Sequence, residues 1–349
     1  MTYDDRYLIS VICSVGGANT VRIMKVHFMW FILSLACMFF WGAADLFYKK
    51  GTDPRDRYSH LKIAVWVGLF MGAFSLVLMP FSETGFSVKS LFENAIKYSP
   101  AALGYIISMV VGYAGLRYLE VSVVSPVQNA SGAFSALVML AWFSARGRIG
   151  EFFGDYWYLN VAGTAVIVGG VVALGIVEQK LSSAEKNVKK EDRKYRFGAL
   201  ALIFPILYCV FDTIGTAADG IILDGESGLG LDEVDVLIIY GLTFFAAGII
   251  AWLFLLVKEK KPYNPFSAKE RDKAIAAHFE EGGQVFYVFA MRAKPVLAAP
   301  MIAAYCVVSV ILSRIFLKEK LKASQYACVA AVIIGIIMLG ILEGLEEAA

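Results

Sequence analysis

The segments WGAAD, at residues 41–45, and YCVFD, at residues 208–212, lie in long apolar runs 167 positions apart. Each places an aromatic residue four positions before an aspartate. Two further pairs of similar segments follow the same order with offsets of 166 and 174: AVIVG at 165–169 with AVIIG at 331–335, and Ser-Pro at 125–126 with Ala-Pro at 299–300. Near-equal offsets in a fixed order predict that the chain contains two copies of one unit.

The composition indicates an integral membrane protein. Of the 349 residues, 58% are hydrophobic and 18% are charged, and the mean hydropathy is +0.65. Soluble domains have about 45–50% apolar and about 25% charged residues, so a soluble enzyme is disfavoured. The net charge of +2 gives no basic field that would attract nucleic acid. The expected partners are therefore the lipid bilayer and a small-molecule substrate.

An all-α fold with ten transmembrane helices is predicted. A spanning helix needs about 20 mostly apolar residues. Ten stretches fit this template: 26–48, 61–79, 101–119, 121–143, 156–177, 197–223, 236–257, 274–291, 295–317 and 324–342. The eighth stretch has the least apolar sequence, because His278, Glu280 and Glu281 interrupt it.

Each unit would contribute five helices, so the second unit must enter the membrane from the opposite side. Such inverted repeats are typical of secondary transporters, whose substrate site lies near the midplane between the halves. The predicted organisation is an N-terminal tail (1–25), a first five-helix repeat (26–177), a basic linker (178–196), a second repeat (197–342) and an acidic tail (343–349). Translation from Met24 is an alternative to an N-terminal tail.

The distribution of basic residues predicts the orientation. Lysine and arginine gather in the linker and in the connections on the same face, whereas the opposite face carries fewer of them. The positive-inside rule then places the linker in the cytoplasm and both termini outside a multi-pass protein of the cell membrane.

The segment FLKEKLK at residues 316–322 leads through Gln325 into a glycine-containing last helix. Together with the Trp41-Gly42 element and the two five-helix halves, this segment resembles the EamA-type transporters of the drug/metabolite transporter superfamily. The first half departs from that pattern, since ARGRIGE at 145–151 stands where a Glu-Lys/Arg-Leu turn is expected. The resemblance implies alternating-access carriage of a small metabolite through a central cavity, and it leaves the cargo open.

Asp45 and Asp212 are the sharpest candidates for substrate binding or coupling. Residues four apart share a helix face, so Trp41 lies over Asp45 and Tyr208 over Asp212. Desolvation disfavours the charged form of a carboxylate, which could therefore exchange a proton or bind a cationic substrate. The alternative is a structural role, with Asp45 paired to Lys49 and Asp212 hydrogen-bonded to neighbouring helices.

Glu280 and Glu281 are further candidates for a gate, a proton site or a contact with a cation. The alternative is that this stretch is a loop or helix end in water. Adjacent helical residues point about 100° apart, so only one of the two is expected to face a cavity. No third ligand accompanies His278 and Glu281, so no metal site is predicted.

Pro126 and Pro300 are expected to perturb the fourth and ninth helices, because proline removes a backbone hydrogen bond and frees a carbonyl. Gln128 and Asn129 could hydrogen-bond a polar substrate, and Tyr305 follows Pro300 at a comparable depth. Buried amides also hold helices together, which is the structural alternative.

The interpretation is a secondary active transporter for a small polar metabolite, with an amino acid or amine favoured and proton coupling possible. A sugar or nucleoside carrier of the same fold would use Gln128, Asn129 and aromatic stacking instead. An intramembrane enzyme or a channel is a distant alternative. No GxxxxGK[ST] phosphate loop is present, so the chain is not predicted to be an ATP-driven pump or to need a cofactor. A monomer or a homodimer would fit.

Overall fold

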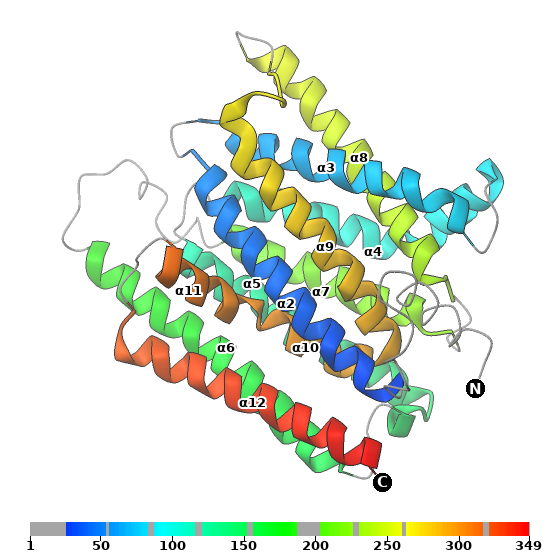
Figure 1. Ribbon diagram of the computed structural model, residues 1–349, viewed down its shortest axis with the longest axis vertical. Helices are drawn as coiled ribbons and strands as arrows, with labels where there is room; N and C mark the ends of the chain where they lie inside the picture. The colour runs from blue at the N-terminus through cyan, green and yellow to red at the C-terminus, as the bar shows by residue number, and fades with distance from the viewer. Residues whose placement is uncertain are drawn as a thin grey trace, which may run out of the picture.

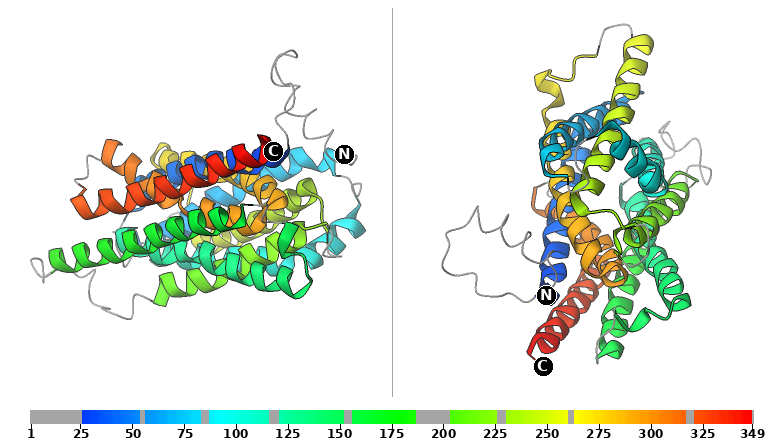
Figure 2. Two further views of the ribbon diagram at one scale, coloured as in Figure 1. Left: turned by 90° about the horizontal axis from the view of Figure 1, so that it is seen from below. Right: turned by 90° about the vertical axis from the view of Figure 1, so that its right-hand side faces the viewer.

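The computed structural model describes residues 26–53, 56–82, 87–115, 121–151, 156–186, 203–225, 230–259, 263–316 and 321–348. The N-terminal tail, most of the basic linker, and Glu319 and Lys320 of the family-like turn lie outside these residues. Every regular element in the part of the chain that is described is helical. Most of the helices run side by side, from the upper left to the lower right in Figure 1 and obliquely to the longest axis of the molecule (Figures 1 and 2).

Eleven main helices make up the bundle in the described part of the chain (Figure 1). They are α2 (Val26–Gly51), α3 (Ser59–Leu78), α4 (Val88–Gly115), α5 (Val121–Ala145), α6 (Trp157–Lys186), α7 (Ile203–Leu223), α8 (Glu233–Lys258), α9 (Arg271–Ala293), α10 (Pro295–Ala303), α11 (Tyr305–Phe316) and α12 (Ala323–Ala348). Short 3₁₀ turns at Met79–Phe81, Ile149–Glu151 and Ala268–Glu270 lie in the connections.

Within the described ranges, eight helical segments are long and apolar enough to cross a bilayer. One of them consists of α10 and α11 together. Helices α5 and α9 fall outside this set. The first half of α9 carries charged residues, and α5 carries Gln128 and Asn129. The chain is therefore an all-helical membrane protein with several apolar spans.

One predicted boundary is wrong, and one predicted helix is interrupted. Helix α4 begins at Val88, well before residue 101, because the polar residues of its first turns form helix although they lack the apolar content of a span. The predicted start of the sixth helix, residue 197, lies outside the described residues, in which α7 begins at Ile203. The predicted ninth helix is broken at Ala304 into α10 and α11.

Helices from the two halves of the chain pack against each other in pairs. The most extensive contacts join α3 to α8, α2 to α9, α6 to α12 and α4 to α7, and α5 to α7 and α2 to α11 also pack closely. Glycines allow the close approach: a Cβ added at Gly104 of α4 would lie 2.8 Å from the Cα of Gly215 in α7. Small residues at such crossings let helix backbones meet.

The side chains are sorted as a bilayer requires. Large apolar side chains such as Ile250 and Leu137 are 68% and 60% exposed on the outside of the bundle. Buried polar groups gather inside it, among them Asn129, Asp219, Glu280 and Gln284. Lipid tails tolerate apolar surface but not unsatisfied polar groups, so this distribution suits a lipid-facing exterior.

Candidate functional site

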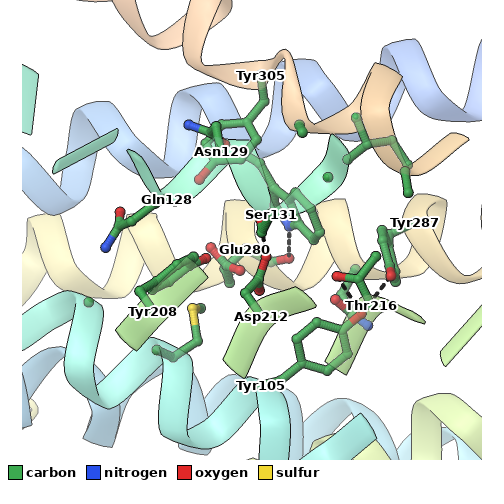
Figure 3. A pocket seen from close by; sticks show the side chains of 18 of the residues that line it. Tyr105, Gln128, Asn129, Ser131, Tyr208, Asp212, Thr216, Glu280, Tyr287 and Tyr305 are labelled. Atoms are coloured by element: carbon green, nitrogen blue, oxygen red, sulfur yellow. Dashed lines mark hydrogen bonds between the residues drawn. The ribbon is translucent and has the colours of Figure 1, made fainter. Parts of the chain in front are cut away.

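A cavity of about 100 Å³ lies in the middle of the bundle, between helices of both halves of the chain (Figure 3). Helices α2, α4 and α5 line it from the first half, and α7 to α11 line it from the second. Its size exceeds the 10–15 Å³ or so that one water molecule needs. Eight predicted site residues line it: Trp41, Asp45, Gln128, Asn129, Tyr208, Asp212, Glu280 and Tyr305.

Asp45 reaches the cavity from α2. Its Oδ2 accepts a hydrogen bond of 2.8 Å from the Ser309 hydroxyl of α11. The side chain is half-buried, since the cavity leaves part of it accessible. A carboxylate held by a helix from the other half of the chain is positioned for a ligand and remains reachable.

Asp212 reaches the same cavity from α7. Its Oδ2 accepts a hydrogen bond of 2.6 Å from the Ser131 hydroxyl of α5 (Figure 3). Ser135, one turn further along α5, donates to the carbonyl of Ser131 at 2.8 Å and to that of Thr213 at 3.3 Å. The two aspartates therefore have equivalent settings, because each accepts from a serine in the other half.

Glu280 is the third carboxylate of the cavity, and it is more deeply buried at 7% exposure. Its Oε2 accepts from the Tyr48 hydroxyl at 3.3 Å, and its backbone carbonyl accepts from the Trp41 indole N–H at 3.3 Å. These bonds join α9 to α2. The alternative of a solvated loop at this stretch is wrong, because α9 is a helix with Glu280 and Glu281 buried.

Aromatic rings form part of the cavity wall. Trp41 stacks on Tyr287 with ring centroids 5.2 Å apart, and Tyr305 meets the edge of the same indole at 5.8 Å. The faces of such rings attract cations, most strongly where water is excluded. Among the lining residues that the structure describes there are three carboxylates and no lysine, arginine or histidine.

Other predicted residues lie elsewhere. Glu281 does not line the cavity; it is buried, and within the described residues its Oε2 has no hydrogen-bond partner. Pro300 lies inside α10 one turn before the break at Ala304, and this break is followed directly by Tyr305. Helix α5 continues through Pro126, whose side chain lies outside the described residues.

Sequence reasoning missed several lining residues, namely Tyr48, Tyr105, Ser131, Thr216, Tyr240 and Gln284. Tyr287 also lines the cavity, but from the sequence a ring in an apolar helix is equally expected at the lipid–water boundary. The one available signal was Ser131, which belongs to a pair of serines four residues apart. Nothing in the sequence shows which face of α4 or α8 turns inward.

Ion pairs lie at both ends of the bundle, away from the cavity. At one end Lys62 pairs with Asp56 at 2.9 Å and with Glu259 at 2.7 Å, and at the other Arg148 pairs with Asp224 at 2.5 Å. Burial alone would raise the pKa of Asp56, but the hydrogen bonds from Lys62 and from the Tyr58 backbone N–H lower that pKa below its ordinary value. These carboxylates have cationic partners within 4 Å, whereas Asp45 of the cavity has Lys49 as a more distant positive neighbour, beyond salt-bridge distance.

A family model described as the EamA-like transporter family matches residues 226–341. This match confirms the resemblance to EamA-type transporters for the second half of the chain. No protein with curated annotation matches the chain. One solved structure, described only as a crystal structure of a protein, is 15% identical, covers 91% of this chain and 98% of its own, and has a TM-score of 0.56. At that identity the similarity shows the fold alone.

Proposed function

Because residues 226–341 match the EamA-like transporter family, we propose that this chain is a secondary active transporter of the cell membrane. It would carry a small polar metabolite by alternating access, as a monomer or a homodimer. The central cavity, which takes its lining from both halves of the chain, would be the cargo site. Transporters built from repeats place their sites at such an interface.

The proposed architecture has ten passes in two inverted repeats, residues 26–177 and 197–342, joined by the basic linker 178–196. Helices α5 and α9 would be the fourth and eighth passes, with their polar groups turned toward the protein interior. The pairing of helices supports a two-fold relation: exchanging the halves turns the α2–α9 contact into α7–α4 and the α5–α7 contact into α11–α2. The start of α2 and the end of α12 also pack together, where Gly340 meets Phe31.

The proposed cargo carries a positively charged amine, as an amine or an amino acid does. The observation that carries this proposal is the lining of three carboxylates without a basic side chain among the described residues. Carboxylates that lie inside a membrane protein are costly and usually serve a function. Coupling to protons is a further part of the proposal, because the same groups can exchange a proton for the cargo.

A sugar or nucleoside is the second candidate. Gln128 and Asn129 line the cavity and could hydrogen-bond hydroxyl groups, while Trp41 offers a stacking surface. This candidate leaves the three carboxylates of the cavity without a basic side chain among the described lining residues. For that reason the amine is favoured over a neutral cargo.

The test is the thermal stability of the purified protein against amino acids, polyamines, sugars and nucleosides. A ligand at about 100 times its dissociation constant should stabilise the folded state by about 2.7 kcal/mol. The stabilisation is expected for amine-bearing ligands, to vanish in Asp212→Asn and to persist in Asp56→Asn, which removes a carboxylate outside the cavity. A shift with sugars alone would replace the amine by the second candidate. No shift with any ligand, or a shift with amines that survives Asp212→Asn, would contradict the proposed site.

A further inference from the structure

A fourth carboxylate, Asp219, lies behind the cavity wall. It follows Asp212 by seven residues, two turns along the same face of α7, and it is fully buried. It does not line the cavity. In the part of the chain that is described, its Oδ1 has no hydrogen-bond partner. Helix packing does not explain the presence of Asp219, because leaving a buried polar atom without a hydrogen bond costs free energy.

The titratable side chains around Asp219 that the structure describes are phenols, and no cation is among them. Tyr98 and Tyr105 face it from α4, Tyr240 belongs to the same cluster from α8, and Tyr287 reaches it from α9. On the sides of α5 and α10, the neighbouring Gly220 meets Met139 and Pro295, which carry no charge.

Arg292 of α9 lies near the C-terminal end of α7, and its guanidinium interacts with groups other than Asp219. Its guanidinium donates to the carbonyl of Leu223 and lies 3.5 Å from the carboxylate of Glu233. An ionised carboxylate in the setting of Asp219 has no counter-charge among the described residues. Ionisation there is costly, and a neutral carboxylic acid is favoured.

A short chain of hydroxyls connects Asp219 to the cavity. The Tyr105 hydroxyl lies 3.5 Å from Oδ2 of Asp219 and 2.5 Å from the Tyr287 hydroxyl, and it donates to Thr216 at 3.3 Å. Tyr105, Thr216 and Tyr287 all line the cavity and point toward one another in Figure 3. The chain therefore runs from the cavity to a carboxylate that the cargo cannot touch.

We propose that Asp219 is a proton-binding site of its own, separate from the cargo carboxylates and filled from the cavity through Tyr287 and Tyr105. A hydronium ion in the cavity gives a proton to the Tyr287 oxygen and becomes water, and Tyr287 releases its own proton to Tyr105. Tyr105 in turn releases its proton to Oδ2 of Asp219. Each hydroxyl gains one proton and loses one, and one new O–H bond forms on the carboxyl group. The coupling part of this inference rests on the proposed transport function.

The first test does not depend on any cargo. Infrared difference spectra of the purified full-length protein between acid and alkaline buffer report protonated carboxylic acids through their C=O stretch. Wild type is expected to show a titrating band that is lost in Asp219→Asn. The band should remain in Asp235→Asn, which removes another buried carboxylate, one that Ser82 and Asn94 hydrogen-bond at the end of the bundle.

Tyr105→Phe keeps Asp219 and removes only the hydroxyl, so it tests the relay even where Asp219→Asn fails to fold. The carboxylic acid band is expected to persist at a shifted frequency. Superimposable spectra for wild type, Asp219→Asn and Tyr105→Phe would overturn the proton site.

The second test separates coupling from transport in proteoliposomes that exchange a labelled amine. Asp219→Asn is expected to keep exchange of labelled for unlabelled amine and to lose accumulation driven by a pH gradient. Accumulation equal to that of wild type, or wild-type exchange that ignores the gradient, would overturn coupling through Asp219. Absence of any exchange in wild type would count against the proposed transport function, while the infrared result would still decide the proton site.

Discussion

The surroundings of Asp45 and Asp212 are two versions of one arrangement. In both, a helix carries an aromatic residue and, four positions later, an aspartate that accepts a hydrogen bond from a serine in the other half of the chain. The two arrangements differ in the residues that the facing helix, α9 or α4, brings to the cavity. A Cβ at Gly283 of α9 would meet the Trp41 ring, and one at Gly112 of α4 would meet the Tyr208 ring at 2.6 Å.

Gly283 of α9 and Gly112 of α4 therefore occupy equivalent positions. A residue that lines the cavity lies three positions before each glycine, Glu280 in α9 and Met109 in α4. The shared aspartates and serines make the arrangement similar on both sides. The unmatched Glu280 makes the cavity asymmetric, with an additional carboxyl group on the side of Asp45. We infer that the common elements bind the cargo and that the difference decides which charge it carries.

Removing one of the shared carboxylates is expected to have the largest effect. Asp212→Asn keeps the acceptor for Ser131 but deletes the charge opposite a bound amine. Loss of one partner from a buried charge pair costs about 2 kcal/mol or more, which is about a 30-fold loss of affinity. Asp45→Asn should behave alike. Isothermal titration with the amine found by stability screening measures both, and unequal losses would contradict the equivalence of the two aspartates.

Replacing the unmatched carboxylate tests the asymmetry. Glu280→Met makes α9 like α4 at this position, and Tyr48 loses its acceptor. Since the two aspartates remain, a smaller loss of about tenfold in affinity for a cationic ligand is expected, or about 1.4 kcal/mol. A neutral analogue of similar shape should bind unchanged. Glu281→Gln serves as the control, because Glu281 does not line the cavity; an equal loss in this control would refute the role of Glu280.

Ser131→Ala and Ser309→Ala each remove one hydrogen bond to an aspartate. A net value of about 1 kcal/mol per hydrogen bond corresponds to about a fivefold loss of affinity. The two variants are expected to match each other in the same titration. Loss in only one of them would show that the apparent equivalence of the two serines has no energetic basis.

Asp56→Asn sharpens the comparison by changing a carboxylate that has a cationic partner. Ligand affinity should not change, and the free energy of unfolding should fall by about 1 kcal/mol or less, as for partly exposed ion pairs. Because the folded-state pKa of Asp56 is lowered, its contribution is present above the unfolded value of about 3.9 and is lost as the pH falls through the folded value. Unfolding curves of wild type and variant should therefore differ at neutral pH and converge in acid.

The sequence predicted more of the aspartate sites than of the rest of the cavity. Apolar runs predict helices, and an aspartate within such a run stands out because its burial is costly. Glu280 also stood out, although its stretch is the least apolar of the ten predicted spans and α9 is not among the eight described segments apolar enough to cross a bilayer. Periodicity alone cannot show that α9 lies against α2, and that contact is what buries Glu280.

For Asp219 the sequence shows the residue but not its surroundings. It lies inside a predicted span and two turns from Asp212, so the helical period could have pointed to it. Its distinguishing feature is a set of tyrosines from α4 and α9 that come together only in the folded bundle. Pro300 predicted a perturbed ninth helix, and the structure adds the position of the break, at Ala304 one turn later.

The most direct test of the central claim is uptake by proteoliposomes of labelled putrescine, glycine and glucose over a range of concentrations, with and without unlabelled compound inside. We expect amine uptake that saturates, accelerates when unlabelled amine is present inside, and is absent in Asp45→Asn and Asp212→Asn. Uptake that rises linearly with concentration, ignores the internal compound and survives both substitutions would contradict a carrier whose cargo site is this cavity.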